Sequence, residues 1–226
     1  MMPVLPLHGT SRAISRIGFG CWAIGKQYWG DDVDDATSAA AIERALELGV
    51  NWFDTAPLYG MGHADTVLTE TLGARRHDVT IATKVGVRMS DTTGHAMSDL
   101  SAAHIAADCE ASLRRLKLDR IPLLQVHWPC EAGTPLNETV DALEVLRASG
   151  RIEAWGVCNY AAPAMQALLR LGAPSSLQTP LSMVRREYEH GLAQVCAPDG
   201  ATPRVSVLAY ETLCRGLLTG KHGATE

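Results

Sequence analysis

Four polar residues of four chemical types lie at the ends of apolar segments or just after them. Asp54 and Lys84 each end a short run rich in β-branched or aromatic residues, and His127 ends another. Tyr59 lies in the loop that follows Asp54. A carboxylate, a phenol, an ammonium and an imidazole brought together could deliver a proton to a carbonyl oxygen.

Each of the four residues has a distinct expected role in that chemistry. Tyr59 is the proton donor, and the charge of Lys84 is expected to lower its pKa from the ordinary value of about 10. Asp54 keeps Lys84 charged and in place, and His127 directs the substrate oxygen. Tuned proton donors of this kind contribute about 10²–10⁴-fold in rate. None of the four can supply a hydride, so the chemistry requires a nicotinamide cofactor.

These residues are set in a repeating pattern of strand, turn and helix. Helical patterns are predicted at residues 35–48, 101–118, 137–148 and 162–171. Strands are predicted at residues 17–22, 51–55, 79–85, 121–128, 152–158, 176–179 and 204–210. Alternation of this kind, with short connections, indicates parallel strands joined by right-handed crossovers.

Two architectures fit this alternation, an open doubly wound sheet and a (β/α)8 barrel. The first strand-to-helix connection lacks the G-x-G-x-x-G pattern of a dinucleotide-binding sheet. Polar residues instead end successive strands, and a barrel gathers such ends around one mouth. We therefore predict an α/β fold, a parallel (β/α)8-type TIM barrel formed as one domain by residues 1–226. The polar strand-end residues are Asp54, Lys84, His127, Asn159 and Gln178.

The composition excludes several other classes of protein. The 226 residues carry a formal net charge of −5, which gives no electrostatic reason to bind nucleic acid or anionic lipid. No signal peptide or membrane-spanning segment is found. The six cysteines have neither zinc-finger nor CxxC spacing, so we expect no metal site and reduced thiols in a cytoplasmic protein.

The sequence resembles the aldo-keto reductases from residue 17 to residue 221. The most specific segment is NWFDTAPLYG at 51–60, which is similar to the family's strand and loop around its catalytic Asp and Tyr. The other similar segments are TKV at 83–85, QVHWP at 125–129, GVCNY at 156–160 and RGLLTGK at 215–221.

The resemblance implies a catalytic tetrad of Asp54, Tyr59, Lys84 and His127, with NADPH as the cofactor and a small carbonyl compound as the substrate. It also implies that Asn159 and Gln178 hold the nicotinamide carboxamide and that Tyr210 stacks on the nicotinamide ring. The full set of implied cofactor-binding residues is Gly20, Cys21, Trp22, Asp54, Cys158, Asn159, Gln178, Tyr210, Leu213, Arg215, Gly216 and Leu217.

Three features depart from the family pattern. Cys158 replaces a common Ser, and Glu211-Thr212 replaces Ser-Pro beside the expected pyrophosphate. The Glu211 carboxylate would repel phosphate unless it points away or pairs with Arg215 or Lys221. After the seventh predicted strand only residues 211–226 follow. We therefore expect a barrel that lacks the eighth strand and the C-terminal helices, with an open edge through which copies of the chain could associate.

Three functions remain open at this point. The first is NADPH-dependent reduction of an aldehyde or ketone. The second is a non-redox dehydratase or isomerase reaction on a shortened barrel, which Glu211 and the missing strand favour. The third is a non-catalytic subunit, against which the intact tetrad argues. Trp22, Trp29 and Trp128 are expected either to line a substrate pocket or to pack in the core.

Overall fold

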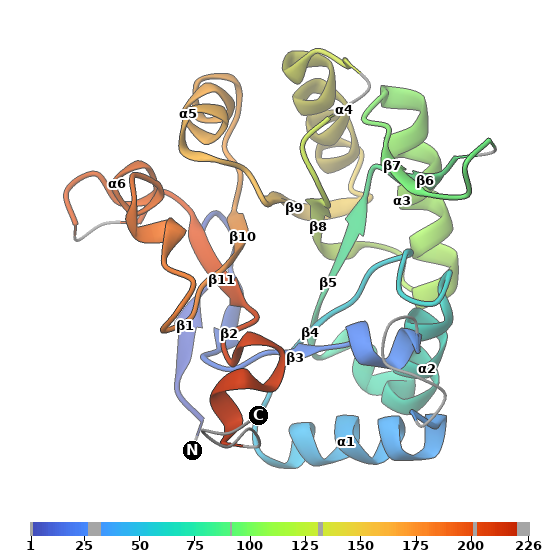
Figure 1. Cartoon of the computed structure of the whole chain (residues 1–226). Helices are drawn as coiled ribbons and strands as arrows, with labels where there is room; N and C mark the ends of the chain where they lie inside the picture. The colour runs from blue at the N-terminus through green and yellow to red at the C-terminus, as the bar shows by residue number, and fades with distance from the viewer. Residues whose placement is uncertain (1, 27–32, 91, 131–132, 201–202, 221–226) are drawn as a thin grey trace.

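Seven parallel strands form one curled sheet in a computed structural model that describes residues 2–26, 33–90, 92–130, 133–200 and 203–220 (Figure 1). The strand order is β11-β10-β9-β8-β5-β4-β3, and every neighbouring pair is parallel. The strands are β3 (Phe19–Gly20), β4 (Trp52–Asp54), β5 (Thr80–Val85), β8 (Ile121–Val126), β9 (Ile152–Cys158), β10 (Ser176–Pro180) and β11 (Ser206–Tyr210).

Helices connect the strands and cover the outer face of the sheet (Figure 1). They are α1 (Asp35–Glu47), α2 (His63–Leu72), α3 (Ala102–Leu116), α4 (Leu136–Ala148), α5 (Ala162–Leu171) and α6 (Leu192–Cys196). Shorter 3-10 turns are η1 (Trp22–Gly25), η2 (Gly73–His77), η3 (Glu187–Glu189) and η4 (Cys214–Thr219). The arrangement is that of a (β/α)8 barrel with seven strands in the described part of the chain, which confirms the predicted fold class.

Two antiparallel hairpins add to this pattern. The first joins β1 (Val4–Pro6) to β2 (Ala13–Ser15), and the second joins β6 (Val87–Met89) to β7 (Ala96–Ser98). The backbone N–H of His8, between β1 and β2, donates a hydrogen bond to Ser206 Oγ at 2.9 Å. The first hairpin therefore contacts the amino-terminal end of β11.

Side-chain alternation divides the buried residues into two layers. One face of each strand packs against the helices, with Phe53, Leu124 and Trp155 in this outer layer. The opposite face points into the barrel, where a small apolar cluster forms a floor. Its members are Leu7, Ile14, Ala82, Leu123, Ala154 and Leu208. Because successive residues of a strand point to opposite faces, Asp54 and Lys84 point inward above this floor.

The predicted strands and helices are all present, but some elements differ. The first strand is limited to Phe19–Gly20, because the chain turns into η1 at Trp22. Helix α2 was not predicted, since its N-cap is Gly62 and no side chain caps it. The two hairpins were also missed, because their three-residue strands are too short to show an alternating pattern.

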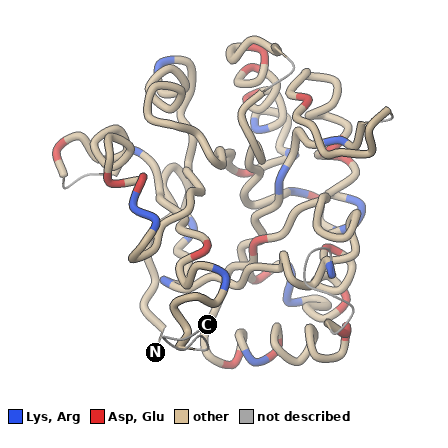
Figure 2. Tube along the Cα trace, in the orientation of Figure 1, with Lys and Arg blue, Asp and Glu red and all other residues tan. Residues whose placement is uncertain are grey.

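Charged residues of both signs are interspersed over the helices (Figure 2). In the described ranges no helix is long and apolar enough to cross a membrane. All six cysteines are free thiols. Trp29 and Lys221, named in the sequence analysis, lie outside the described residues.

Candidate active site

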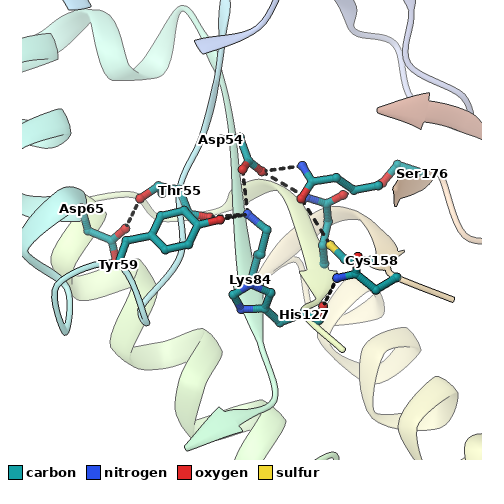
Figure 3. Close-up of polar contacts among 11 residues, drawn as sticks. Asp54, Thr55, Tyr59, Asp65, Lys84, His127, Cys158 and Ser176 are labelled. Atoms are coloured by element: carbon teal, nitrogen blue, oxygen red, sulfur yellow. Dashed lines mark hydrogen bonds and ion pairs between the residues drawn. The ribbon is translucent and has the colours of Figure 1, made fainter. Parts of the chain in front are cut away.

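Lys84 is the centre of a hydrogen-bonded cluster at the carboxyl ends of β4 and β5. Its Nζ donates to Asp54 Oδ2 at 2.7 Å, to the Thr55 carbonyl at 3.1 Å and to the Tyr59 hydroxyl at 3.1 Å (Figure 3). The Lys84 side chain is only 1% exposed. All three acceptors belong to residues 54–59, so one short segment satisfies the whole ammonium group.

His127 lies at the same rim, directly after β8. Its ring is perpendicular to that of Tyr59, with 6.1 Å between the centroids, and it stacks on Trp128 at 4.6 Å. Burial, together with the nearby charge of Lys84, lowers the pKa of His127 well below its usual value. The imidazole is therefore neutral at physiological pH, and the four residues predicted from the sequence converge at one place.

The pKa of Tyr59 differs from the sequence-based prediction. Burial raises the pKa of Tyr59 to about 12, and this effect exceeds the opposing effect of the Lys84 charge. The predicted influence of Lys84 is present, but the net direction was wrong because the depth of burial cannot be read from the sequence. The consequence is a phenol that keeps its proton at neutral pH.

Lys84 itself remains charged. Burial alone would lower the pKa of Lys84, but the carboxylate of Asp54 more than compensates, and the net pKa is raised. The ion pair at 2.7 Å therefore holds a permanent positive charge next to the Tyr59 hydroxyl.

A second group of polar side chains fixes Asp54 from the opposite side. Gln178 Nε2 donates to Asp54 Oδ1 at 2.9 Å, and Gln125 Nε2 approaches the same oxygen at 3.4 Å. Ser176 Oγ in turn donates to Gln125 Oε1 at 3.0 Å. This bond passes across Gly156 in the strand between them, where an added Cβ would lie 2.0 Å from Ser176 Oγ.

Sequence reasoning did not assign a role to Gln125 or Ser176. The available signal was the two-residue period of a strand, because Gln125 on β8 is two residues before His127, and Ser176 is two residues before Gln178 on β10. Residues two apart in a strand share a face. Cys158 lies in the same network, and its thiol donates to Gln178 Oε1 at 3.5 Å.

Asn159 and Tyr210, predicted to contact the nicotinamide, contact each other. The Tyr210 hydroxyl donates to Asn159 Oδ1 at 2.7 Å, while Asn159 Nδ2 donates to the His127 carbonyl at 3.1 Å. Asn159 has a left-handed backbone with φ of 64°. These contacts join the ends of β8, β9 and β11 on one side of the mouth.

Glu211 is paired with two arginines rather than one. Its carboxylate accepts from Arg185 Nη1 at 2.8 Å and from Arg215 Nε at 2.6 Å, and the side chain is 10% exposed. Pairing with Arg215 was one of the predicted alternatives, whereas pairing with Arg185 was not expected. The guanidinium of Arg215 also lies 5.2 Å from the centre of the Trp22 ring. Arg185 Nε also lies 4.0 Å from Glu187 Oε1, so the two guanidinium groups face two carboxylates.

The remaining predicted cofactor residues lie either around the end of β3 or around η4. Gly20 pairs with Asp54 in the sheet, and the Cys21 N–H donates to the Asp54 carbonyl at 2.8 Å. The Cys21 side chain is fully buried in the layer between sheet and helices, so only its backbone lies at the rim. Leu213 and Leu217 are more than half exposed beside Gly216, which has φ of 101°.

A cavity of about 1080 Å³ opens along the inside of the sheet. Its lining includes Gly20, Asp54, Gln178 and Tyr210, four of the residues predicted to bind the cofactor. Most of the other lining residues belong to the β1–β2 hairpin, β3 and β11, whereas Tyr59, Lys84 and His127 are not among them. In the part of the chain that the structure describes, no group of three or more His, Cys, Asp or Glu side chains could hold a metal ion.

The fold is a (β/α) barrel, and the polar residues of the site lie at the carboxyl ends of its strands. The aldo/keto reductase family model matches residues 16–226, so the chain belongs to this family.

Curated relatives of the chain are longer than the chain itself. An aldo-keto reductase of Bacillus subtilis is 35% identical over 94% of the chain, which spans 62% of that protein. The NADH-specific methylglyoxal reductase of Escherichia coli is 32% identical over 97% of the chain, which spans 70% of it.

Solved structures of the family superimpose on most of the chain. The glycerol dehydrogenase of Gluconobacter oxydans has a TM-score of 0.88 and 33% identity, with 99% of this chain and 67% of that chain covered. An aldo-keto reductase of Klebsiella pneumoniae in complex with NADPH has a TM-score of 0.79 and 27% identity, with 99% of this chain and 74% of that chain covered.

Proposed function

We propose that the protein is an NADPH-dependent oxidoreductase that reduces an aldehyde or ketone to an alcohol, with Tyr59 as the proton donor. One observation carries the proposal. The Tyr59 hydroxyl lies 3.1 Å from the Nζ of a buried, permanently charged Lys84, beside a neutral His127.

The side chains divide the work of proton transfer. Tyr59 holds its proton at neutral pH and gives it to the carbonyl oxygen as negative charge develops there. Lys84 stabilises the resulting phenolate, and Asp54 keeps Lys84 in position. The neutral imidazole of His127 can donate a hydrogen bond that orients the carbonyl oxygen.

Other side chains of the rim would bind the cofactor. When bound, the cofactor supplies the hydride. Asn159 and Gln178 would hold its carboxamide, and Tyr210 would stack on its ring. Arg215, with Leu213, Gly216 and Leu217, would contact the diphosphate.

The choice of NADPH over NADH rests on family members. The Klebsiella pneumoniae structure contains NADPH, whereas the Escherichia coli relative is NADH-specific. Titrating the protein with each cofactor, followed by intrinsic fluorescence, tests this choice. Equal or tighter binding of NADH would reject the NADPH assignment but not carbonyl reduction.

Turnover with a panel of small aldehydes and ketones tests the reaction itself. Consumption of NADPH should occur with the unmodified protein and fall at least about 100-fold in Tyr59→Phe. Tyr188→Phe is the control, because it removes the hydroxyl of another partly buried tyrosine, in η3 rather than in the tetrad. Equal turnover in Tyr59→Phe and the unmodified protein would reject Tyr59 as the donor.

The non-redox alternative loses one of its two arguments. Glu211 was expected to repel a phosphate, but Arg185 and Arg215 both pair with its carboxylate. Substrate conversion without any nicotinamide would be the result that restores this alternative.

We also propose that the protein is cytoplasmic and that copies of it associate through the sheet edges. In the described residues, β3 and β11 are the edge strands and do not pair with each other. Unpaired edges invite pairing with another chain. Light scattering should show a mass that rises with protein concentration, and a constant monomer mass would reject self-association.

A further inference from the structure

Asp65 on α2 is a fully buried acidic residue outside the tetrad. Its side chain is 0% exposed. Oδ2 accepts from Arg115 Nε at 2.9 Å, and Oδ1 accepts from the Thr55 hydroxyl at 2.7 Å. Both carboxylate oxygens are therefore used, one by a cation on α3 and one by Thr55, the residue after Asp54. Figure 3 shows the bond between Asp65 and Thr55.

Thr55 connects this buried ion pair to the tetrad. It is 0% exposed, and each of its polar groups has a partner. The N–H donates to the Ala82 carbonyl at 2.8 Å, and the carbonyl accepts from Lys84 Nζ at 3.1 Å. The hydroxyl reaches Asp65. Thr55 is thus fixed on one side by the sheet and on the other by α2.

The Arg115 side chain also lies close to the loop that carries Tyr59. Its Nη2 donates to Ser112 Oγ at 3.1 Å, on the same helix α3. A Cβ added at Gly62, where φ is 91°, would lie 2.8 Å from Arg115 Cδ. The backbone of this loop therefore lies against the guanidinium chain, three residues after Tyr59.

A buried ion pair is weak evidence for stability, because removing two charges from water offsets much of their attraction. Its better attested effect is to select one arrangement of the groups around it. Here the arrangement selected is that of residues 54–59, which supply all three hydrogen-bond acceptors of Lys84.

We propose that Asp65, anchored by Arg115, is a positioning residue that acts through the Thr55 hydroxyl to hold residues 54–59 at hydrogen-bond distance from Lys84. The proposal rests on the proposed carbonyl reductase function. A small displacement of this segment separates the proton donor from the charge that stabilises its phenolate.

Substitutions at Thr55 separate this role from simple packing. Thr55→Val keeps the shape but loses the hydroxyl, whereas Thr55→Ser keeps the hydroxyl. We expect kcat to fall about tenfold in Thr55→Val with less than about a twofold change in KM, and Thr55→Ser to restore at least half of the wild-type kcat. Glu153→Gln is the control, since it removes a partly buried ion pair with Arg12 that touches no site residue.

A stability measurement tests the coupling without any turnover. Asp65→Asn and Tyr59→Phe, alone and combined, form a double-mutant cycle in urea. Because no direct bond joins the two side chains, coupling through Thr55 predicts that their effects on the unfolding equilibrium constant deviate from additivity by a factor of about 3 or more. The cycle of Glu153→Gln with Tyr59→Phe should be additive.

These experiments test the positioning role of Asp65 separately from the proposed carbonyl reductase function. Wild-type kcat in Thr55→Val, failure of Thr55→Ser to restore kcat, or an additive Asp65–Tyr59 cycle each overturns the positioning role. If the wild-type protein turns over no carbonyl compound, the proposed function fails, and the cycle alone decides whether Asp65 positions the segment.

Discussion

Substituting Tyr59 by Phe should change how the stability of the protein depends on pH. The folded protein holds the Tyr59 proton with a pKa of about 12 because the phenol is buried. In the unfolded chain the same group has a pKa of about 10. The unfolded chain therefore releases this proton first as the pH rises, and unfolding becomes more favourable.

The magnitude follows from the difference between the two pKa values. One pKa unit corresponds to about 1.4 kcal/mol, so two units correspond to about 2.7 kcal/mol. This contribution is complete below about pH 10 and is lost as the pH rises to about 12. At pH 11 about half of it, or about 1.4 kcal/mol, should already be lost.

The assay is urea unfolding of the wild-type protein and Tyr59→Phe at about pH 8 and pH 11. Burial also raises the pKa of Tyr160, Tyr188 and Tyr210, but these residues are common to both proteins and cancel in the difference. The wild-type protein should lose about 1.4 kcal/mol more than Tyr59→Phe over this range.

A pH-independent difference between the two proteins would refute the reasoning. It would mean that the charge of Lys84 offsets burial completely and that the phenol has its ordinary pKa. A wild-type protein that gains stability relative to Tyr59→Phe at high pH would show that Lys84 dominates, as the sequence analysis expected.

Three further predictions concern His127, Lys84 and Gly156. Because burial lowers the pKa of His127, kcat/KM for carbonyl reduction should show no inflection near pH 6.5, and a loss of rate on acidification through that pH would contradict a neutral imidazole. Lys84→Met should reduce kcat/KM at least about 100-fold while the Kd for NADPH, from fluorescence titration, changes less than about threefold; a change mainly in Kd would assign Lys84 to cofactor binding. Gly156→Ala should lower the free energy of unfolding, measured in urea, by about 1–3 kcal/mol, because its Cβ would lie 2.0 Å from Ser176 Oγ. Gly20→Ala is the control and should lower it by less, because a Cβ added at Gly20 would have no neighbouring atom within 4 Å.

That Asp54, Lys84 and His127 lie close together could be predicted from the sequence by one geometric rule. Parallel strands of a barrel end at the same rim, so residues such as Asp54 and Lys84 at strand ends must approach one another. Helix α3 was predicted well for a different reason, since Ser101 caps its first turn and Arg114 and Arg115 occupy its last. Local signals of this kind need no knowledge of the rest of the fold.

The parts that were missed depend on depth and on partners. The direction of the Tyr59 pKa is set by how completely the barrel excludes water, and no local pattern reports that. The Thr55–Asp65–Arg115 contacts join three elements, and α2, which carries Asp65, has no side-chain cap to mark its start. Arg185 reaches Glu211 from a separate loop, so its role appears only when the chain is folded.

Inside the barrel, the apolar floor and the polar side chains above it imply that the effects of inherited variation should depend on depth within the barrel as well as on the face of the strand. Exchanges among the aliphatic residues of the floor, such as Ala82 or Leu123, would alter how much folded protein a cell accumulates. Exchanges two residues further along the same strands, at Lys84 or Gln125, would alter what each folded molecule can do. A saturation library scored once for abundance and once for enzymatic output should therefore separate adjacent inward positions of a single strand into opposite categories.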